Sequence, residues 1–164
     1  MAFERFHEAL RLVMQHHASH VDKAGVPYIM HLTRVAGYVA EAYPGDRMED
    51  LMITALLHDI IEDCKYPSQG IQIIFGDEIA EAVCVLSKKP GQGYDDYIDG
   101  ILGNYLAIRV KLWDLRHNMD ASRLQNVVEP QEKRMKRLAK YSKAYQRILI
   151  KMEEDTADVG STVQ

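Results

Sequence analysis

The sequence predicts an all-α domain, and two observations carry that prediction. Apolar residues recur at helical spacing along most of the 164 residues, and no segment alternates strictly enough to indicate a half-buried strand. Glycine and proline residues divide the chain into segments of helical length. A chain of this size holds one core, so we expect a single compact orthogonal helical bundle over residues 1–152.

The helix boundaries follow from these breaks. The segment "CKYPS", with Pro67, ends the third expected helix, and "SKKPGQG" over residues 87–93 reads as a loop. Residues 153–164 are acidic or small and have little to bury, so we expect a frayed C-terminal tail. The expected helices cover residues 3–19, 28–42, 48–63, 69–75, 78–86, 94–102, 105–119 and 131–152.

Composition excludes several classes of protein. The formal net charge of -4 gives no basic surface for nucleic acid. No apolar stretch approaches the ~20 residues of a membrane span, and the first residues, "MAFERFHEALRL", are unlike a secretory signal. We therefore expect a cytoplasmic protein that acts on a small molecule and binds no membrane. Nothing in the sequence predicts the oligomeric state.

The two cysteines, Cys64 and Cys84, are far apart and form no C-x-x-C pair. Neither a disulfide framework nor a thiolate zinc site is predicted from this spacing. We expect two reduced and buried thiols.

One apolar segment, "TALLHDIIEDC" over residues 54–64, holds a histidine and three carboxylates. His58 and Glu62 are four residues apart, as are Asp59 and Asp63, so a helix would place them in two adjacent polar rows. A buried carboxylate is costly unless it is paired or binds a metal ion. Taken alone, the segment could equally be a solvated helix end.

Two other segments contain polar residues in apolar surroundings. His31 lies within "GVPYIMHLTRVA" and Asp114 within "IRVKLWDLRHNMD". Each has a plainer explanation by itself, such as a histidine that a backbone carbonyl satisfies. Together with His58 and Asp59 they make two imidazoles and two carboxylates from three helices, a mixed set suited to a divalent transition ion.

This ordered pattern of His, His-Asp and Asp resembles that of the HD-domain metal-dependent phosphohydrolases. The blocks "HASHVDKAGVPYIMH", "ALLHDIIED", "FGDEIAEAV", "LSKKPGQGYDDYI" and "VKLWDLRHNMD" are similar, in order, to the hydrolase domain of the RelA/SpoT-type alarmone enzymes. The resemblance covers residues 7–150 and is to the stand-alone hydrolases, with no synthetase domain following. It implies an all-helical enzyme that removes the 3′-pyrophosphate of (p)ppGpp, using Mn²⁺ and a metal-activated water.

The resemblance also implies roles for single residues. The metal ligands would be His31, His58, Asp59 and Asp114. Glu62 and Asp63 match the pair that orients or deprotonates the attacking water. Lys23 and Asn118 match positions near the nucleotide, and Arg116 is a further candidate for substrate contact. Other basic candidates for the pyrophosphate are Lys88, Lys111 and Arg123.

The chain departs from the family pattern where the nucleotide would bind. Asp22 and Asp120 stand where the family commonly has basic residues, and Arg116 follows Asp114 by two positions rather than one. One position on a helix is a rotation of about 100°. The departures leave the four candidate metal ligands unchanged. The alternative functions are therefore hydrolysis of another nucleotide or phosphate ester, or a non-catalytic module that binds a nucleotide or a metal ion.

Two smaller features have competing interpretations. His16 and His20 are one helical turn apart in "QHHASH" and could chelate a metal ion, although His17 is the residue that matches the family histidine. Tyr94 and Tyr97 could stack on a base, but an aromatic pair at helical spacing is more often core.

Overall fold

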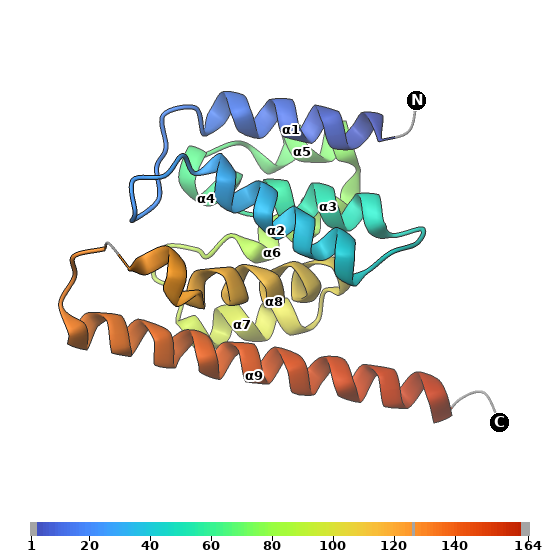
Figure 1. Ribbon diagram of the computed structural model, residues 1–164. Helices are drawn as coiled ribbons and strands as arrows, with labels where there is room; N and C mark the ends of the chain where they lie inside the picture. The colour runs from blue at the N-terminus through green and yellow to red at the C-terminus, as the bar shows by residue number, and fades with distance from the viewer. Residues whose placement is uncertain (1–2, 126, 162–164) are drawn as a thin grey trace.

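The computed structural model describes residues 3–125 and 127–161, and within them it is helical, without a strand (Figure 1). The prediction of an all-α domain is confirmed. A single antiparallel β-bridge between Val21 and Pro27 closes the loop after the first helix. The helices are α1 (Glu4–His16), α2 (Ile29–Ala42), α3 (Met48–Leu57), α4 (Ile60–Cys64), α5 (Ser68–Phe75), α6 (Asp77–Leu86), α7 (Tyr94–Leu102), α8 (Tyr105–Met119), the 3₁₀ helix η1 (Ala121–Leu124) and α9 (Gln131–Ser161).

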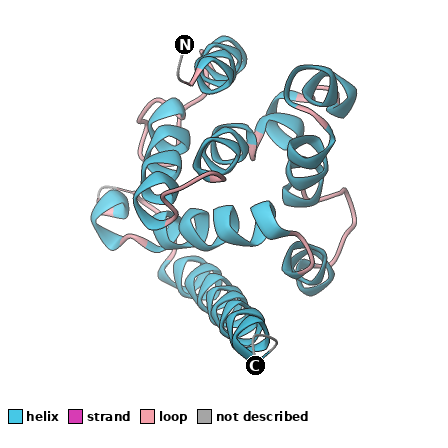
Figure 2. Ribbon diagram, turned by 90° about the vertical axis from the view of Figure 1, so that its right-hand side faces the viewer, coloured by secondary structure: helices cyan, strands magenta, loops and turns pink. Residues whose placement is uncertain are grey.

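The helices pack around α3 and α8. Helix α3 contacts α1, α2, α6 and α8, and α9 lies across α7 and α8 at the opposite side of the molecule from α1 (Figure 1). Figure 2 looks along some helices and across others, which is the crossing arrangement expected of an orthogonal bundle. Helices distant in sequence therefore meet at the centre.

From Leu51 onward, helix α3 is almost entirely apolar, because this part of the helix lies in the core. Leu51, Ile53, Leu56 and Leu57 are all fully buried. A helix that is hydrophobic all round is a buried helix. Its C-terminal end therefore carries the next residue, His58, into the interior.

The prediction of one continuous helix over residues 48–63 is wrong. Helix α3 ends at Leu57 and α4 begins at Ile60, and Asp59 between them has φ -106° and ψ -3°, in the bridge region of backbone conformation. The His58 imidazole donates from Nδ1 to the Ala55 carbonyl at 2.7 Å. This turn changes the direction of the Asp59 side chain and brings its carboxylate to the His58 ring.

The C-terminal helix is longer than predicted. Helix α9 continues past residue 152 to Ser161, so the expected frayed tail is wrong as far as residue 161, while residues 162–164 lie outside the described residues. Lys151 pairs with Asp155 one turn later, and Glu and Ala are good helix formers, so local interactions extend the helix without burial. Within the described residues no helix is long and apolar enough to cross a membrane.

Both cysteines are free thiols, but neither is fully buried. Cys84 is exposed on α6, and Cys64 is partly buried at the end of α4. The expectation of two buried thiols is therefore wrong, because position 84 lies on the solvent side of its helix.

Candidate active site

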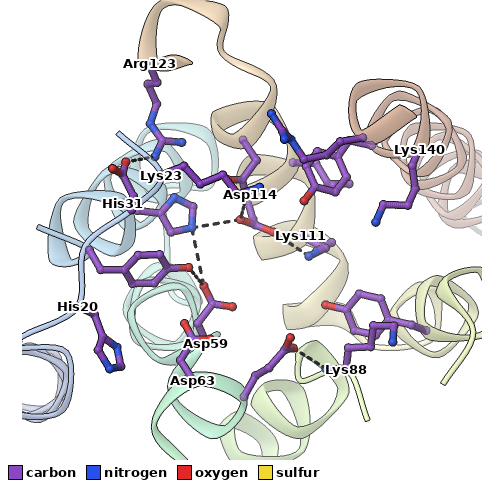
Figure 3. A pocket seen from close by; sticks show the side chains of 18 of the residues that line it. His20, Lys23, His31, Asp59, Asp63, Lys88, Lys111, Asp114, Arg123 and Lys140 are labelled. Carbon is purple, nitrogen blue, oxygen red and sulfur yellow. Dashed lines mark hydrogen bonds and ion pairs between the residues drawn. The ribbon is translucent and has the colours of Figure 1, made fainter. Parts of the chain in front are cut away.

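Four side chains from three parts of the fold converge on one point, and Figure 3 labels three of them, His31, Asp59 and Asp114. His31 comes from α2, His58 and Asp59 from the turn between α3 and α4, and Asp114 from α8. His58 Nε2 lies 3.0 Å from Asp59 Oδ2, and His31 Nε2 lies 3.2 Å from Asp114 Oδ1. The cross distances are 3.6 Å from His58 Nε2 to Asp114 Oδ1 and 3.9 Å from His31 Nε2 to Asp59 Oδ2.

The two imidazoles present nitrogen atoms that nothing else occupies. His31 and His58 are 3% and 1% exposed, and neither Nε2 atom has a hydrogen-bond partner among the described residues. Because His58 donates from Nδ1 to Ala55, Nε2 is the nitrogen that gives up its proton when a metal ion binds. Cis ligands of an octahedral ion with bonds of about 2.1 Å lie about 3 Å apart. His31, His58 and Asp114 therefore fit a divalent cation, and Asp59 lies beside them against the His58 ring.

A second histidine orients the His31 ring. His31 Nδ1 lies 2.7 Å from His117 Nδ1, and the two rings stack with centroids 4.9 Å apart. Burial and the neighbouring His31 lower the pKa of His117 to about 4, so His117 is neutral near pH 7. A neutral His117 that accepts the His31 proton at Nδ1 leaves the His31 Nε2 lone pair directed at the carboxylates.

The two carboxylates are held by hydrogen-bond donors, two of which bind the same oxygens that face the imidazoles. The Tyr28 hydroxyl donates to Asp59 Oδ2 at 2.5 Å. Lys111 Nζ donates to Asp114 Oδ2 at 2.8 Å, and Asn118 Nδ2 donates to Asp114 Oδ1 at 2.6 Å. Burial alone would raise the pKa of Asp114, but Lys111 and the histidines hold this pKa well below its usual range. Asp114 is therefore anionic.

The cluster carries an excess of negative charge that attracts a cation. Burial lowers the pKa of His58, but the carboxylates of Asp59 and Asp114 outweigh it and raise this pKa well above its usual value. The same carboxylates that favour a proton on His58 favour a metal ion in its place.

His31, Asp59 and Asp114 of the cluster line the floor of a pocket of about 730 Å³, a size that suits a small-molecule ligand, and His58 is buried and is not among the lining residues. The walls are cationic and aromatic, so an anionic ligand with a ring is favoured. The cations come from the loop after α1, from the loop before α7, and from α8, η1 and α9; they are Lys23, Lys88, Lys111, Arg123, Arg137 and Lys140. The tyrosines are Tyr28, Tyr94, Tyr97 and Tyr141.

The predicted catalytic pair also lines this pocket. Glu62 Oε2 accepts from the Lys88 backbone N–H at 2.9 Å, which ties α4 to the loop before α7. Partial burial, together with the negative charges of Asp59 and Glu62, raises the pKa of Asp63 to about 6. Asp63 therefore titrates close to the pH range in which a proton donor or acceptor works best.

The predicted substrate contacts divide into two groups. Lys23 and Asn118 line the pocket, but Arg116 does not. The Arg116 guanidinium lies 4.8 Å over the Trp113 ring and 5.9 Å over the Tyr38 ring. Because two positions on a helix are a rotation of about 200°, Arg116 points away from the side of α8 that carries Asp114. Arg116, predicted to contact substrate, therefore stands outside the lining of the pocket where Lys23 and Asn118 lie.

The two aspartates that depart from the family pattern have structural partners. Asp22 Oδ1 accepts from the backbone N–H groups of Ala24 and Val26, and Asp22 Oδ2 accepts from Arg123 Nη2 at 2.8 Å. Asp120 caps η1 by accepting from the backbone N–H and hydroxyl of Ser122, outside the pocket lining. Neither aspartate adds an unpaired negative charge to the pocket.

Helix α9 supplies a wall that the sequence interpretation missed. Arg137 and Tyr141 line the pocket, and they lie on the same helix face as the buried residues Ala144 and Ile148. The spacing from 137 to 141, 144 and 148 is the signal that could have identified this face. Lys140, on the same part of α9, places Nζ 4.5 Å over the Tyr94 ring.

The comparisons with known proteins agree with this architecture. Residues 9–88 match the family model described as HD domain, so this part of the chain is similar to that family. More particularly, it resembles the SpoT-type hydrolases. A solved structure described as a metazoan ortholog of SpoT that hydrolyzes ppGpp has the same fold, with a TM-score of 0.76, 22% identity and coverage of 96% of both chains.

Curated relatives extend the similarity to sequence. The bifunctional (p)ppGpp synthase/hydrolase SpoT of Escherichia coli is 28% identical over 128 residues, which are 71% of this chain and 18% of that protein. A probable guanosine-3′,5′-bis(diphosphate) 3′-pyrophosphohydrolase of Synechocystis is 31% identical over 138 residues, 77% of this chain and 17% of that protein. A probable GTP pyrophosphokinase of Mycobacterium leprae is 31% identical over 124 residues, 70% of this chain and 15% of that protein. The chain thus spans less than a fifth of the length of these relatives.

Proposed function

We propose that the protein is a metal-dependent pyrophosphohydrolase that removes the 3′-pyrophosphate of (p)ppGpp or a similar nucleotide, with Mn²⁺ as its ion. One observation carries the proposal: two buried, unpartnered imidazole nitrogens face two carboxylates at the floor of a cation-lined pocket. The names of the similar proteins, several of them guanosine-3′,5′-bis(diphosphate) 3′-pyrophosphohydrolases, support the choice of substrate.

The metal ligands in this proposal are His31, His58, Asp59 and Asp114. Two neutral imidazoles and two carboxylates suit Mn²⁺, an ion that accepts both nitrogen and oxygen ligands. When bound, the ion lowers the pKa of the attacking water and withdraws charge from a phosphoryl oxygen. Tyr28, Lys111 and Asn118 position the carboxylates through the hydrogen bonds described above.

Asp63 transfers the protons, and Glu62 positions the water. Water attacks the phosphorus bonded to the 3′ oxygen, the bond from that phosphorus to the 3′ oxygen breaks, and GDP and pyrophosphate result from ppGpp. Asp63, whose pKa is raised to about 6, accepts the proton of the water and supplies one to the 3′ oxygen as it leaves. Glu62 is fixed by Lys88 N–H and orients the water.

The pocket walls bind the nucleotide. Lys23, Lys88, Arg123, Arg137 and Lys140 neutralise the phosphates from several directions. Tyr94 and Tyr141 offer faces for the base. Asp114 takes one N–H of the Asn118 amide, so the amide oxygen and the second N–H are left for the sugar or base.

A second candidate is hydrolysis of another nucleotide or phosphate ester, and it rests on Asp22 at the pocket wall. The ion pair with Arg123 weakens this argument, because it neutralises Asp22 and keeps a guanidinium in the pocket. A non-catalytic binding module is less favoured, since Glu62 and Asp63 both line the pocket.

The test is turnover of ppGpp by the purified protein with Mn²⁺, with GDP and pyrophosphate quantified and a chelator-treated sample as control. Metal-dependent release of both products supports the proposal. Turnover of a 5′-monophosphate by the metal-loaded protein, with no action on ppGpp, would favour the second candidate instead.

Two variants separate the roles of the residues. Asp59→Asn is expected to abolish metal binding, because it removes a charged ligand. Glu62→Gln is expected to keep the metal and lose at least tenfold in kcat. Equal loss of metal from both variants, measured by elemental analysis, would contradict this division.

A further inference from the structure

A second cluster of metal-ligating side chains lies beside the active site and shares none of its ligands. His17 and His20 lie in the turn after α1, and Cys64 ends α4. One ligand atom from each residue lies within 4.8 Å of the other two. The pair considered from the sequence, His16 and His20, does not form, because α1 ends at His16 and the His16 ring packs edge-on against Tyr66.

Within the cluster, His17 makes close contacts with both His20 and Cys64. His17 Nδ1 lies 3.1 Å from His20 Nδ1, and His17 Nε2 lies 3.4 Å from Cys64 Sγ. Ligand atoms around a tetrahedral zinc ion, with bonds of about 2.0–2.3 Å, lie roughly 3.3–3.7 Å apart. An ion takes only one ring nitrogen of His17, and one ligand atom from each of the three residues lies within 4.8 Å of the other two, so a closure of about 1 Å brings them to this spacing.

The protonation state of the cluster favours a metal ion. His17 is 2% exposed, and burial together with His20 lowers its pKa to about 4. It is neutral near pH 7, so it has a lone pair to donate. A thiol with two imidazoles is a softer donor set than the two carboxylates and two imidazoles of the active site, and thiolate ligands select zinc over Mn²⁺ or Mg²⁺.

We propose that His17, His20 and Cys64 form a second metal site that binds Zn²⁺, with a fourth position open to water. Zinc sites with three protein ligands commonly keep such a position. His20 also lines the active-site pocket, where it lies near Asp63 (Figure 3), so the ion can enter from the pocket side. The proposal does not depend on the substrate of the active site.

Zinc binding at this site must release a proton. Burial, together with Asp63 and Asp59, raises the pKa of the Cys64 thiol, so the free site holds a protonated sulfur. The metal ligand is the thiolate, and the ion displaces the proton. Affinity is therefore expected to rise with pH over the neutral range.

The experiment uses Co²⁺ as a spectroscopic substitute for zinc in the full-length protein. Thiolate coordination gives a charge-transfer absorption band that nitrogen and oxygen ligands do not give. The band is expected in the wild type and in Cys84→Ser, and it is expected to disappear in Cys64→Ser. Absence of the band from the wild type, or its persistence in Cys64→Ser, would overturn the proposal.

Alkylation of the thiols provides a second readout. Zn²⁺ is expected to slow iodoacetamide modification of Cys64 at least tenfold and to leave the exposed Cys84 unchanged as an internal reference. His20→Gln is expected to abolish most of this protection. Equal modification of Cys64 with and without Zn²⁺ would reject the site. Mn²⁺-dependent ppGpp turnover, assayed in parallel on Cys64→Ser, tests the proposed function separately.

Discussion

In the proposed function, the hydroxyl of Tyr28 positions the metal ligand Asp59. It donates to Asp59 Oδ2 at 2.5 Å, and burial beside Asp59 raises the pKa of Tyr28, so the hydroxyl stays protonated. Tyr28→Phe removes this donor and should weaken Mn²⁺ binding by about 10-fold or more, the usual effect of losing an outer-shell partner. Titration calorimetry measures the change. Tyr105→Phe, on the solvent-exposed side of α8, is the control and should leave the affinity unchanged.

Asp63 should set the acid limb of the pH–rate profile. A base must be ionised to accept a proton, so kcat/KM should fall as the pH drops through about 6. When a bound cation offsets the charge of Asp59, the pKa of Asp63 falls, and the decrease in kcat/KM should begin at a somewhat lower pH. Asp63→Asn should lower the rate and abolish this limb. Glu62→Gln should lower the rate and keep the limb. If the acid limb of the profile survived in Asp63→Asn but not in Glu62→Gln, Glu62 would be the base and Asp63 the residue that orients the water.

At the scale of single residues, the sequence predicted the polar site residues whose burial is costly without a partner. His31, His58, Asp59 and Asp114 stand in apolar segments, where a polar group needs a partner, and the structure brings them together. The position of Arg116 could not be predicted in this way, because an exposed arginine costs nothing on either face of α8 and stacks on the Trp113 ring.

At the scale of elements, hydrophobic periodicity predicted where most helices lie but not where one helix turns. The run from residue 48 to residue 63 keeps its apolar pattern through His58 and Asp59, so nothing in the pattern marks the break between α3 and α4. The break depends on tertiary contacts. Asp59 turns toward the His58 ring and Tyr28, and Tyr28 reaches it from the loop before α2.

Helix α9 should control substrate affinity rather than chemistry. Lys140 lines the pocket from this helix, over the ring of Tyr94 and apart from the metal ligands. Lys140→Ala should raise KM for ppGpp by about 5–30-fold, equivalent to roughly 1–2 kcal/mol for one charged contact to a phosphate, with kcat and metal content unchanged. Lys136→Ala, one turn earlier and paired with Glu132 at the surface, is the matched control. A KM that responds equally to both changes would remove α9 from the binding site.

At the scale of the whole molecule, the pocket exists because distant segments meet. One wall comes from residues near the start of the chain, the floor from α2, α8 and the turn before α4, and another wall from α9 (Figure 3). The sequence indicated the floor, since its ligands stand out against apolar neighbours. It did not indicate the wall from α9, because lysines and arginines are common on any exposed helix. Which of these side chains face the pocket depends on how the helix packs through Ala144 and Ile148.

The metal site should couple binding to the stability of the whole fold. His31, His58 and Asp114 come from separate helices and are buried, so a bound ion links α2, α8 and the turn before α4 in the folded state alone. At 100 times Kd, a ligand that binds only the folded state adds about 2.7 kcal/mol. For a domain of this length that corresponds to a rise in Tm of roughly 5–11 °C. Calorimetry of Mn²⁺-loaded and chelator-treated protein measures it, and Asp59→Asn should show little or no shift. If the chelator left the wild-type Tm unchanged, the four residues would not hold an ion tightly in the folded protein.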